Sequence, residues 1–221
     1  MSVPTFNYRR MVDLSRPIVP SEGRFVHYRT GVETIDEQPS DRWYIATYLE
    51  MGGHAGTHVE APLHAVEDGT SIAELDVERF FGGAIVLNLS TASMGQAIAV
   101  EVLQEAAEPG GGVQAGDIVL LRFDWDRRCS PGDYPPHPST QALEWLVGQG
   151  VKLVGIDSPG LDIQGDRSLP NHHLLFSHSI PLIESLDNLD QLQQARIYLF
   201  AQPLRVTNSD AVPLRVLAFE A

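Results

Sequence analysis

The chain has 221 residues, of which 43% are apolar, and a formal net charge of −14. This length predicts a single domain over residues 1–221 with one substantial core. The negative charge repels phosphate backbones, and no run of Lys or Arg reverses it locally, so we expect no nucleic-acid partner. Cys129 is the only cysteine, which excludes an intrachain disulfide and a cysteine-based zinc cage.

The sequence predicts neither a membrane segment nor a signal peptide. Its longest apolar runs fall far short of the roughly 20 residues that span a bilayer. Arg9 and Arg10 are followed by MVDLSRPIVP, which lacks the apolar run and the cleavage site of a signal peptide. We therefore expect a cytoplasmic protein without membrane contact.

The N-terminal part predicts two short strands that are separated by a polar surface segment. Val12 to Ile18 is predicted as a short strand closed by prolines, and residues 21–42 are polar and rich in Gly, Pro and acidic residues. Trp43 to Met51 alternates loosely and predicts the strand that leads into the next segment. Trp43 and Tyr44 either line a pocket or pack in the core, and the frequency of aromatic residues in cores favours packing.

Gly52 to His64 reads GGHAGTHVEAPLH and gathers three of the chain's eight histidines. A helix is disfavoured because Glu60 lies six residues from His54 and would point away from it, and because the glycines and Pro62 oppose helix formation. The segment is therefore no HExxH zinc helix.

An extended chain brings the same side chains together instead. His54, His58, Glu60 and His64 share one parity and can face one side, with Pro62 at an edge or at the exit of the strand. Imidazole and carboxylate ligands suit a divalent ion such as zinc or manganese. The alternative is a set of hydrogen-bonded core histidines, but three histidines with one carboxylate favour a metal site.

The central part predicts a parallel strand-helix-strand unit. Gly83 to Ser90 is a predicted buried strand and Val100 to Ala107 a predicted helix, followed by the strand IVLLRFDWD after Asp117, a helix from Ser139 or Thr140 through Val147, and the strand Val151 to Ile156. Parallel strands place ligand groups beyond their carboxyl ends. That rule points to Phe123 to Asp126 and to residues 157–159. Asp157 either supports the site or caps a turn, whereas Ser158 lies outside a GxSxG nucleophile motif.

A second histidine group precedes a short predicted strand near the C-terminus. His172, His173 and His178 come before the strand Ile180 to Ile183, which Glu184 follows. Residues 196–204 and 211–219 are predicted as closing strands.

The segment from His54 resembles the HxGTHxDxPxH signature of the cyclase family of metal-dependent hydrolases, which includes kynurenine formamidases and isatin hydrolases. DLSRPI, GIDSPGLD and SLDNLDQL resemble further runs of this family, the last predicting a short helix after Asn188 and Leu189. The chain departs from the family at Glu60, where Asp is usual, at Ala65, where many members carry Phe, and at Gly160, where Ser is common. The matching residues of the signature are His54, Gly56, Thr57, His58, Pro62 and His64.

The resemblance implies an α/β protein with a swivelling β/β/α fold and a mixed sheet or barrel-like core, usually a homo-oligomer such as a dimer or tetramer. It implies His64 as the catalytic proton-transfer residue. His173 and His178 fall outside the family's spacing and would form hydrogen bonds or line the pocket, while the adjacent His173 stays open as the alternative to His172. The implied metal ligands, which include a histidine twelve residues before a glutamate, are His54, His58, Glu60, His172 and Glu184.

The implied activity is hydrolysis of a small aryl formamide or cyclic amide, such as N-formylkynurenine or isatin, with one or two zinc or manganese ions per chain. Trp43, Tyr44, Phe123 and Trp125 lie near the predicted site segments and suit an aromatic small-molecule substrate. Two alternatives stay open. One is a lactone or cyclic-imide hydrolase, and the other is a non-catalytic metal-binding or small-molecule-binding protein, which would have no use for a free imidazole at His64.

Overall fold

The computed structural model describes residues 7–19, 26–29, 48–163 and 165–221, so Trp43 and Tyr44 lie outside the described residues. The α-helices are α1 Val100–Ala107, α2 Trp125–Arg128, α3 Thr140–Gly148 and α4 Pro170–Ser177, and the 3₁₀ helices are η1 Pro62–His64, η2 Ile72–Glu74, η3 Val77–Phe80, η4 Glu108–Gly110 and η5 Leu189–Gln191. The strands are β1 Arg10–Asp13, β2 Val26–Arg29, β3 Tyr48–Met51, β4 His58–Glu60, β5 Phe81–Asn88, β6 Ala97–Ile98, β7 Ile118–Arg122, β8 His137–Pro138, β9 Leu153–Ile156, β10 Leu182–Glu184, β11 Arg196–Phe200, β12 Ala211–Pro213 and β13 Leu217–Glu220. Within the described ranges, no helix is long and apolar enough to cross a bilayer.

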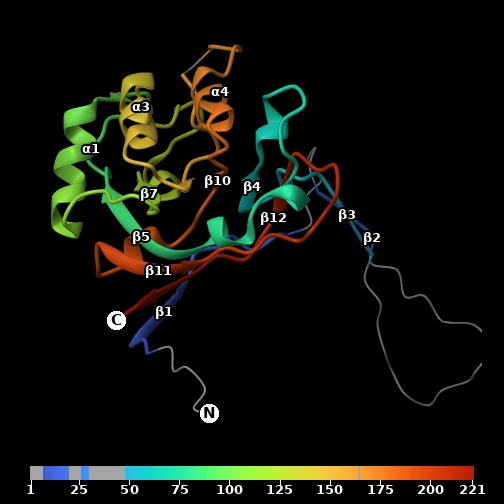
Figure 1. The fold of residues 1–221 in the computed structure, drawn as a ribbon, viewed down its shortest axis with the longest axis horizontal. Helices are drawn as coiled ribbons and strands as arrows, with labels where there is room; N and C mark the ends of the chain where they lie inside the picture. The colour runs from blue at the N-terminus through green and yellow to red at the C-terminus, as the bar shows by residue number, and fades with distance from the viewer. Residues whose placement is uncertain (1–6, 20–25, 30–47, 164) are drawn as a thin grey trace, which may run out of the picture.

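Nine of these strands form one sheet in the order β1-β13-β11-β5-β7-β9-β10-β4-β12. The four central strands, β5, β7, β9 and β10, are parallel, whereas the outer pairs are antiparallel. Helices α1, α3 and α4 lie together on one side of the parallel part, and the sheet curls towards a half-barrel (Figure 1). These features confirm the predicted α/β class with a mixed sheet.

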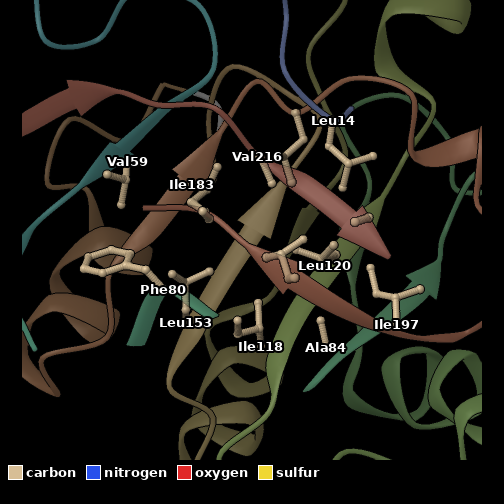
Figure 2. Close-up of a cluster of buried hydrophobic side chains, with 14 of the residues drawn as sticks. Leu14, Val59, Phe80, Ala84, Ile118, Leu120, Leu153, Ile183, Ile197 and Val216 are labelled. Carbon is tan, nitrogen blue, oxygen red and sulfur yellow. The ribbon is translucent and has the colours of Figure 1, made fainter. Parts of the chain in front are cut away.

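The two sides of the sheet bury separate apolar clusters because the side chains of a strand alternate between its faces. In β7, Val119 and Leu121 pack on the helix side, while Ile118 and Leu120 join the cluster on the opposite side. Figure 2 shows this opposite cluster, to which β5, β9, β10 and β11 also contribute side chains. A strand that is buried on both faces needs apolar residues at every position, which explains the unbroken run at 118–121.

Helices α1 and α3 form where the sequence predicts them. In α1, Leu103 and Ala107 of the expected apolar stripe are buried. Ser139 caps α3, because its side-chain oxygen accepts the backbone N–H of Ala142 at 3.2 Å. Strands β7 and β9, which flank α3 in the sequence, are parallel neighbours as predicted.

The expected strand through the histidine-rich segment is much shorter than predicted. Only β4 is extended, because turns precede it and Pro62 begins the 3₁₀ helix η1 directly after Ala61. Gly56 has a φ of 62°, the left-handed conformation that turns the chain into the strand. Pro62 lacks the N–H that a continuing strand would donate. The predicted shared face therefore holds within β4, but the prediction that His54 and His64 belong to the same strand is wrong.

The predicted closing strand at 211–219 is two strands at opposite ends of the sheet. β12 pairs with β4, whereas β13 pairs with β11 and β1. Pro213 ends β12, and the next residue, Leu214, donates its N–H to the carbonyl oxygen of Thr57 at 3.1 Å. This hydrogen bond is one step beyond the last register pair, Pro213 with His58, and the chain then continues to β13.

Asp157 follows β9, and its carboxylate ties the ends of β7 and β9 together. Both of its oxygens accept the N–H of Phe123 at 3.0 Å, and Oδ2 accepts the N–H of Asp124 at 2.8 Å. Of the two roles that the sequence left open, these contacts support the cap. Burial raises the pKa of Asp157 to about 6, although the backbone hydrogen bonds oppose the rise.

The stability of the protein should therefore depend on pH through Asp157. Its pKa in the folded protein, about 6, lies above the ordinary value of 3.8, so its protonation favours folding below about pH 4 and this contribution is lost as the pH rises through about 6. Relative to Asp157→Asn, which cannot titrate, the free energy of unfolding of the wild type should fall by about 1–3 kcal/mol between about pH 4 and about pH 7. Urea unfolding at both pH values measures this change, and a constant difference contradicts the prediction.

Candidate metal centre

Strand pairing brings the first candidate ligands together. Val59 of β4 lies in the apolar cluster of Figure 2, so His58 and Glu60 face the other side of the strand. β10 is an antiparallel neighbour of β4, and Glu184 lies directly opposite His58. Side chains of such cross-strand partners meet on one face. His58 Nε2 lies 3.4 Å from Glu60 Oε1 and 3.8 Å from Glu184 Oε2, and all three residues are buried.

The N-terminus of α4 places His172 over these carboxylates. Leu169 precedes the helix with a φ of 50°, and Pro170 takes the first helical position, whose φ the proline ring already fixes. Asp162 accepts the backbone N–H of Asn171 at 2.8 Å and also contacts His172 Nδ1. One buried carboxylate therefore anchors both the start of the helix and the imidazole that it carries.

The contacts of His58 and His172 fix which ring nitrogen faces the carboxylates. His58 Nδ1 lies 2.9 Å from the carbonyl oxygen of Gly56, and His172 Nδ1 contacts Asp162. An oxygen acceptor at Nδ1 requires that nitrogen to carry a hydrogen, so in the neutral ring the lone pair lies on Nε2.

When the rings are neutral, lone pairs from two imidazoles and two carboxylates therefore converge. His172 Nε2 lies 3.1 Å from Glu60 Oε2 and 3.5 Å from Glu184 Oε1. In metal sites, histidine ligands are held in this way, with one ring nitrogen bonded to an outer acceptor and the other free to bind the ion.

His54 and His64 reach the same cluster from outside β4, through Asp210. Asp210 Oδ2 lies 2.9 Å from His54 Nε2 and 3.0 Å from His64 Nδ1. His54 Nδ1 is 2.7 Å from Glu60 Oε1 and 3.3 Å from His58 Nε2. His64 Nε2 is farther away, at 4.0 Å from Glu60 Oε1. Partial burial alone would raise the pKa of Asp210, but the hydrogen bonds from His64 and His54 lower it.

The electrostatics of the cluster call for positive charge. The Glu60 carboxylate raises the pKa of His54 to about 9. Burial alone would lower the pKa of His172, but the carboxylates of Asp162, Glu184 and Glu60 outweigh burial and raise it to about 12. Glu60 Oε2 and Glu184 Oε1 are buried and accept no hydrogen bond within the described part of the chain. A bound cation would satisfy these oxygens and replace the protons on the imidazoles.

Two overlapping groups of side chains offer suitable ligand atoms. His54, Glu60 and His64 have ligand atoms within 4.8 Å of one another, and so do His58, Glu60 and Glu184. Glu60 belongs to both groups. The structure thus brings the five predicted ligands into one cluster, with the predicted proton-transfer residue beside them.

A cavity of about 410 Å³ opens next to the cluster. Trp125 and Pro159, which follow β7 and β9, line it, so the carboxyl ends of the parallel strands border the site as predicted. Phe123 instead packs in the helix-side core. The lining residues are Glu60, His64, Trp125, Asp133, Tyr134, Pro135, Pro159, Gly160, Asp162, Leu169, His172 and Glu184.

The remaining sequence candidates are exposed or make other contacts. His172 is buried whereas the adjacent His173 is exposed, so the structure selects His172 of this pair. His178 is exposed, and its Nδ1 lies 2.9 Å from the carbonyl oxygen of Leu174. Ser158 Oγ donates to the carbonyl oxygen of Gly160 at 3.2 Å, which agrees with its exclusion as a nucleophile.

Two residues of the site, Asp162 and Asp210, received no role from the sequence. Asp162 closes the GIDSPGLD run, ten residues before His172, so its place in a family-like run was a usable signal. Asp210 is one of 29 acidic residues and lies in a polar stretch, TNSD, that has no distinguishing pattern.

Comparison with known proteins identifies the family. The sequence profile of the family described as "Putative cyclase" matches residues 12–163, more than half of the chain. The chain belongs to this cyclase family. The match includes the histidine-rich segment and the GIDSPGLD run, so the resemblance seen in the sequence is confirmed.

Other members of the cyclase family match most of the chain. A kynurenine formamidase from Bacillus cytotoxicus is 31% identical over 170 residues, which are 76% of this chain and 77% of that protein. A kynurenine formamidase from Erythrobacter litoralis is 30% identical over 221 residues, 96% of this chain and 94% of that protein. Isatin hydrolase A from Labrenzia aggregata, solved with benzyl benzoate bound, has a TM-score of 0.80 at 27% identity and covers 96% of this chain and 93% of its own. This likeness confirms the predicted fold of the family.

Gly53 should be essential for the position of His54. A Cβ at Gly53 would lie 2.3 Å from the carbonyl oxygen of Ala211, so the turn before β4 can pack against β12 only with glycine. Gly53→Ala should lower the free energy of unfolding by about 1–3 kcal/mol. Urea unfolding measures the effect. Gly148→Ala in α3 is the matched control, because its Cβ would meet nothing within 4 Å. An equal loss of unfolding free energy in the two variants would contradict the role of the close contact between Gly53 and Ala211.

Proposed function

We propose that this chain is a metal-dependent amidohydrolase that cleaves the C–N bond of a small aryl formamide or cyclic amide. The observation that carries the proposal is the convergence of free imidazole nitrogens on the buried carboxylates of Glu60 and Glu184. The relatives named kynurenine formamidase and isatin hydrolase support a substrate of the N-formylkynurenine or isatin type. Trp125, Tyr134 and Pro159 in the cavity wall fit a flat aromatic ring.

The proposed cofactor is zinc or manganese, with one or two ions per chain. Nitrogen and carboxylate ligands suit both ions. The membership of Glu60 in both ligand groups supports two ions. When bound, such an ion lowers the pKa of a bound water and polarises a carbonyl group. The residues that would hold it are His54, His58, Glu60, His172 and Glu184.

Glu60 suits this role although the family usually carries Asp at its position. Its Oε1 faces His54 and its Oε2 faces His172, at 2.7 and 3.1 Å. The extra methylene of glutamate lets one carboxylate reach imidazoles from two different parts of the chain.

His64 would transfer protons during hydrolysis. Its Nδ1 is bonded to Asp210, so its Nε2 carries the lone pair, and the side chain lines the cavity. Nε2 can accept a proton from the attacking water and return it to the departing nitrogen, so that the amide becomes a carboxylic acid and an amine. His64 lies beside the proposed ligands in space, which gives it access to both water and substrate.

Two further parts of the proposal come from the sequence. The family resemblance supports a homo-oligomer, either a dimer or a tetramer. The cytoplasmic location that the sequence predicts is kept as the second part of the proposal.

Metal-replete protein should hold between one and two equivalents of zinc or manganese per chain. His172→Ala removes a buried imidazole from the cluster and should weaken metal binding by more than about tenfold. Equilibrium dialysis followed by elemental analysis measures the content. His173→Ala is the matched control, since this neighbour on α4 is exposed. Wild-type content below about half an equivalent, or equal metal affinity in the two variants, overturns the ligand assignment.

Metal-loaded wild type should hydrolyse N-formylkynurenine or isatin in preference to peptides and phosphate esters. The test is a panel of these compounds, together with an aliphatic lactone, followed by absorbance. His64→Ala should keep its metal and lose about 10²- to 10⁴-fold in kcat, because only proton transfer is removed.

Each outcome of the panel separates one hypothesis from another. Turnover of the lactone alone would replace the aryl amide substrate with an ester-like one and leave the metal hydrolase intact. No turnover of any compound by metal-loaded protein would favour a binding protein. Near wild-type turnover by His64→Ala would remove His64 from the mechanism, and loss of metal in this variant would make it a ligand.

A further inference from the structure

Asp210 is held in place by backbone contacts on both sides of the residue. It precedes β12, and its carbonyl oxygen accepts the N–H of Ala61 at 2.8 Å, directly after Glu60. The carbonyl oxygen of the preceding residue, Ser209, accepts the N–H of Ile72 at 3.0 Å. The strand register, in which Ala211 lies opposite Glu60, continues this anchoring. The carboxylate therefore projects from a fixed backbone at the edge of the candidate metal centre.

A single oxygen of this carboxylate contacts two imidazoles from separate segments. Asp210 Oδ2 lies 2.9 Å from His54 Nε2 and 3.0 Å from His64 Nδ1. His54 belongs to the turn before β4, whereas His64 ends η1 after it. The two rings are neighbours, with centroids 4.6 Å apart.

Each nitrogen that contacts Asp210 must carry a hydrogen, because a carboxylate can only accept. His54 Nδ1 and His64 Nε2 are left to face the cluster, 2.7 and 4.0 Å from the same atom, Glu60 Oε1. Without a metal, the contact with the Glu60 carboxylate keeps a proton on His54 Nδ1, and a bound cation would replace that proton. In the opposite tautomers, His54 Nδ1 and His64 Nε2 would both carry a hydrogen. His54 could then not bind a metal ion through Nδ1, and His64 could not accept a proton at Nε2.

We propose that Asp210 is a positioning residue that sets the tautomers of His54 and His64 together, so that one free nitrogen faces the metal and the other faces the reacting water. This inference rests on the proposed metal-hydrolase function. It assigns Asp210 a role in both binding and turnover, although it touches neither the proposed ion nor the substrate.

The two readouts of the test use Asp210→Ala, which removes the acceptor, and Asp210→Asn, which keeps one acceptor oxygen. The side chain is 45% exposed, so neither change empties a core position. Both variants should therefore fold as the wild type does.

The first readout is the tautomer itself. Zinc-loaded protein labelled with ¹⁵N-histidine is studied by long-range ¹H–¹⁵N correlation, which distinguishes hydrogen on Nδ1 from hydrogen on Nε2. In wild type His64 should carry hydrogen on Nδ1, and in Asp210→Ala on Nε2 or on a mixture of both nitrogens. The same His64 tautomer in both proteins, or an Nε2–H tautomer in wild type, overturns the proposal.

The second readout is kinetic, at saturating zinc and with the substrate that the wild type turns over. Asp210→Ala should lose about 10- to 10²-fold in kcat with KM changed less than about threefold, and Asp210→Asn should recover most of the loss. In a His64→Ala background, Asp210→Ala should change kcat by less than about twofold, because the residue acts through His64. An equal loss in both backgrounds, or none in wild type, contradicts the proposal. If wild type hydrolyses nothing, the proposed function fails, and the tautomer measurement still decides the role of Asp210.

Discussion

The arrangement of the site depends on the burial of two carboxylates, Glu60 and Glu184, on neighbouring strands. Two anions that are removed from water side by side are unfavourable unless hydrogen bonds or positive charge compensate them. The register of β4 and β10 places both on one face, so the compensation must come from that face. Imidazoles surround them there, and each ring is anchored by an outer acceptor: the carbonyl oxygen of Gly56, Asp162 or Asp210. The outer acceptors hold the rings, and the rings surround the two carboxylates, where protons on the imidazoles or a bound cation can supply the positive charge.

Much of the fold followed from the sequence because its signals are local. The apolar runs of β5, β7 and β9 need burial on both faces and therefore imply central strands. The cap at Ser139 marks the start of α3 by a hydrogen bond within one turn. The length of a strand was harder to predict, since β4 begins after the turn at Gly56 and ends before Pro62. The split of the last predicted strand depends on which neighbour each half pairs with, and no local pattern encodes that choice.

The site was predictable where two residues share one element and less so elsewhere. His58 and Glu60 face one side because they alternate within β4. His54 and His64 were placed near them for the wrong reason, as members of one long strand. They reach the cluster by bonding to Asp210, a residue far away in the sequence whose surroundings there are ordinary. Asp162 stood in a family-like run, but its partnership with His172 requires the packing of α4.

The place of β4 in the sheet also determines when the cluster can exist. β4 lies between β10 and β12, and both of these neighbours come late in the sequence. Such contacts close long loops, whose entropic cost must be met before the strand gains its partners. During synthesis, the histidine-rich segment is therefore present long before its partner strands β10 and β12 have been made. The site can therefore be completed only after synthesis has passed Pro213.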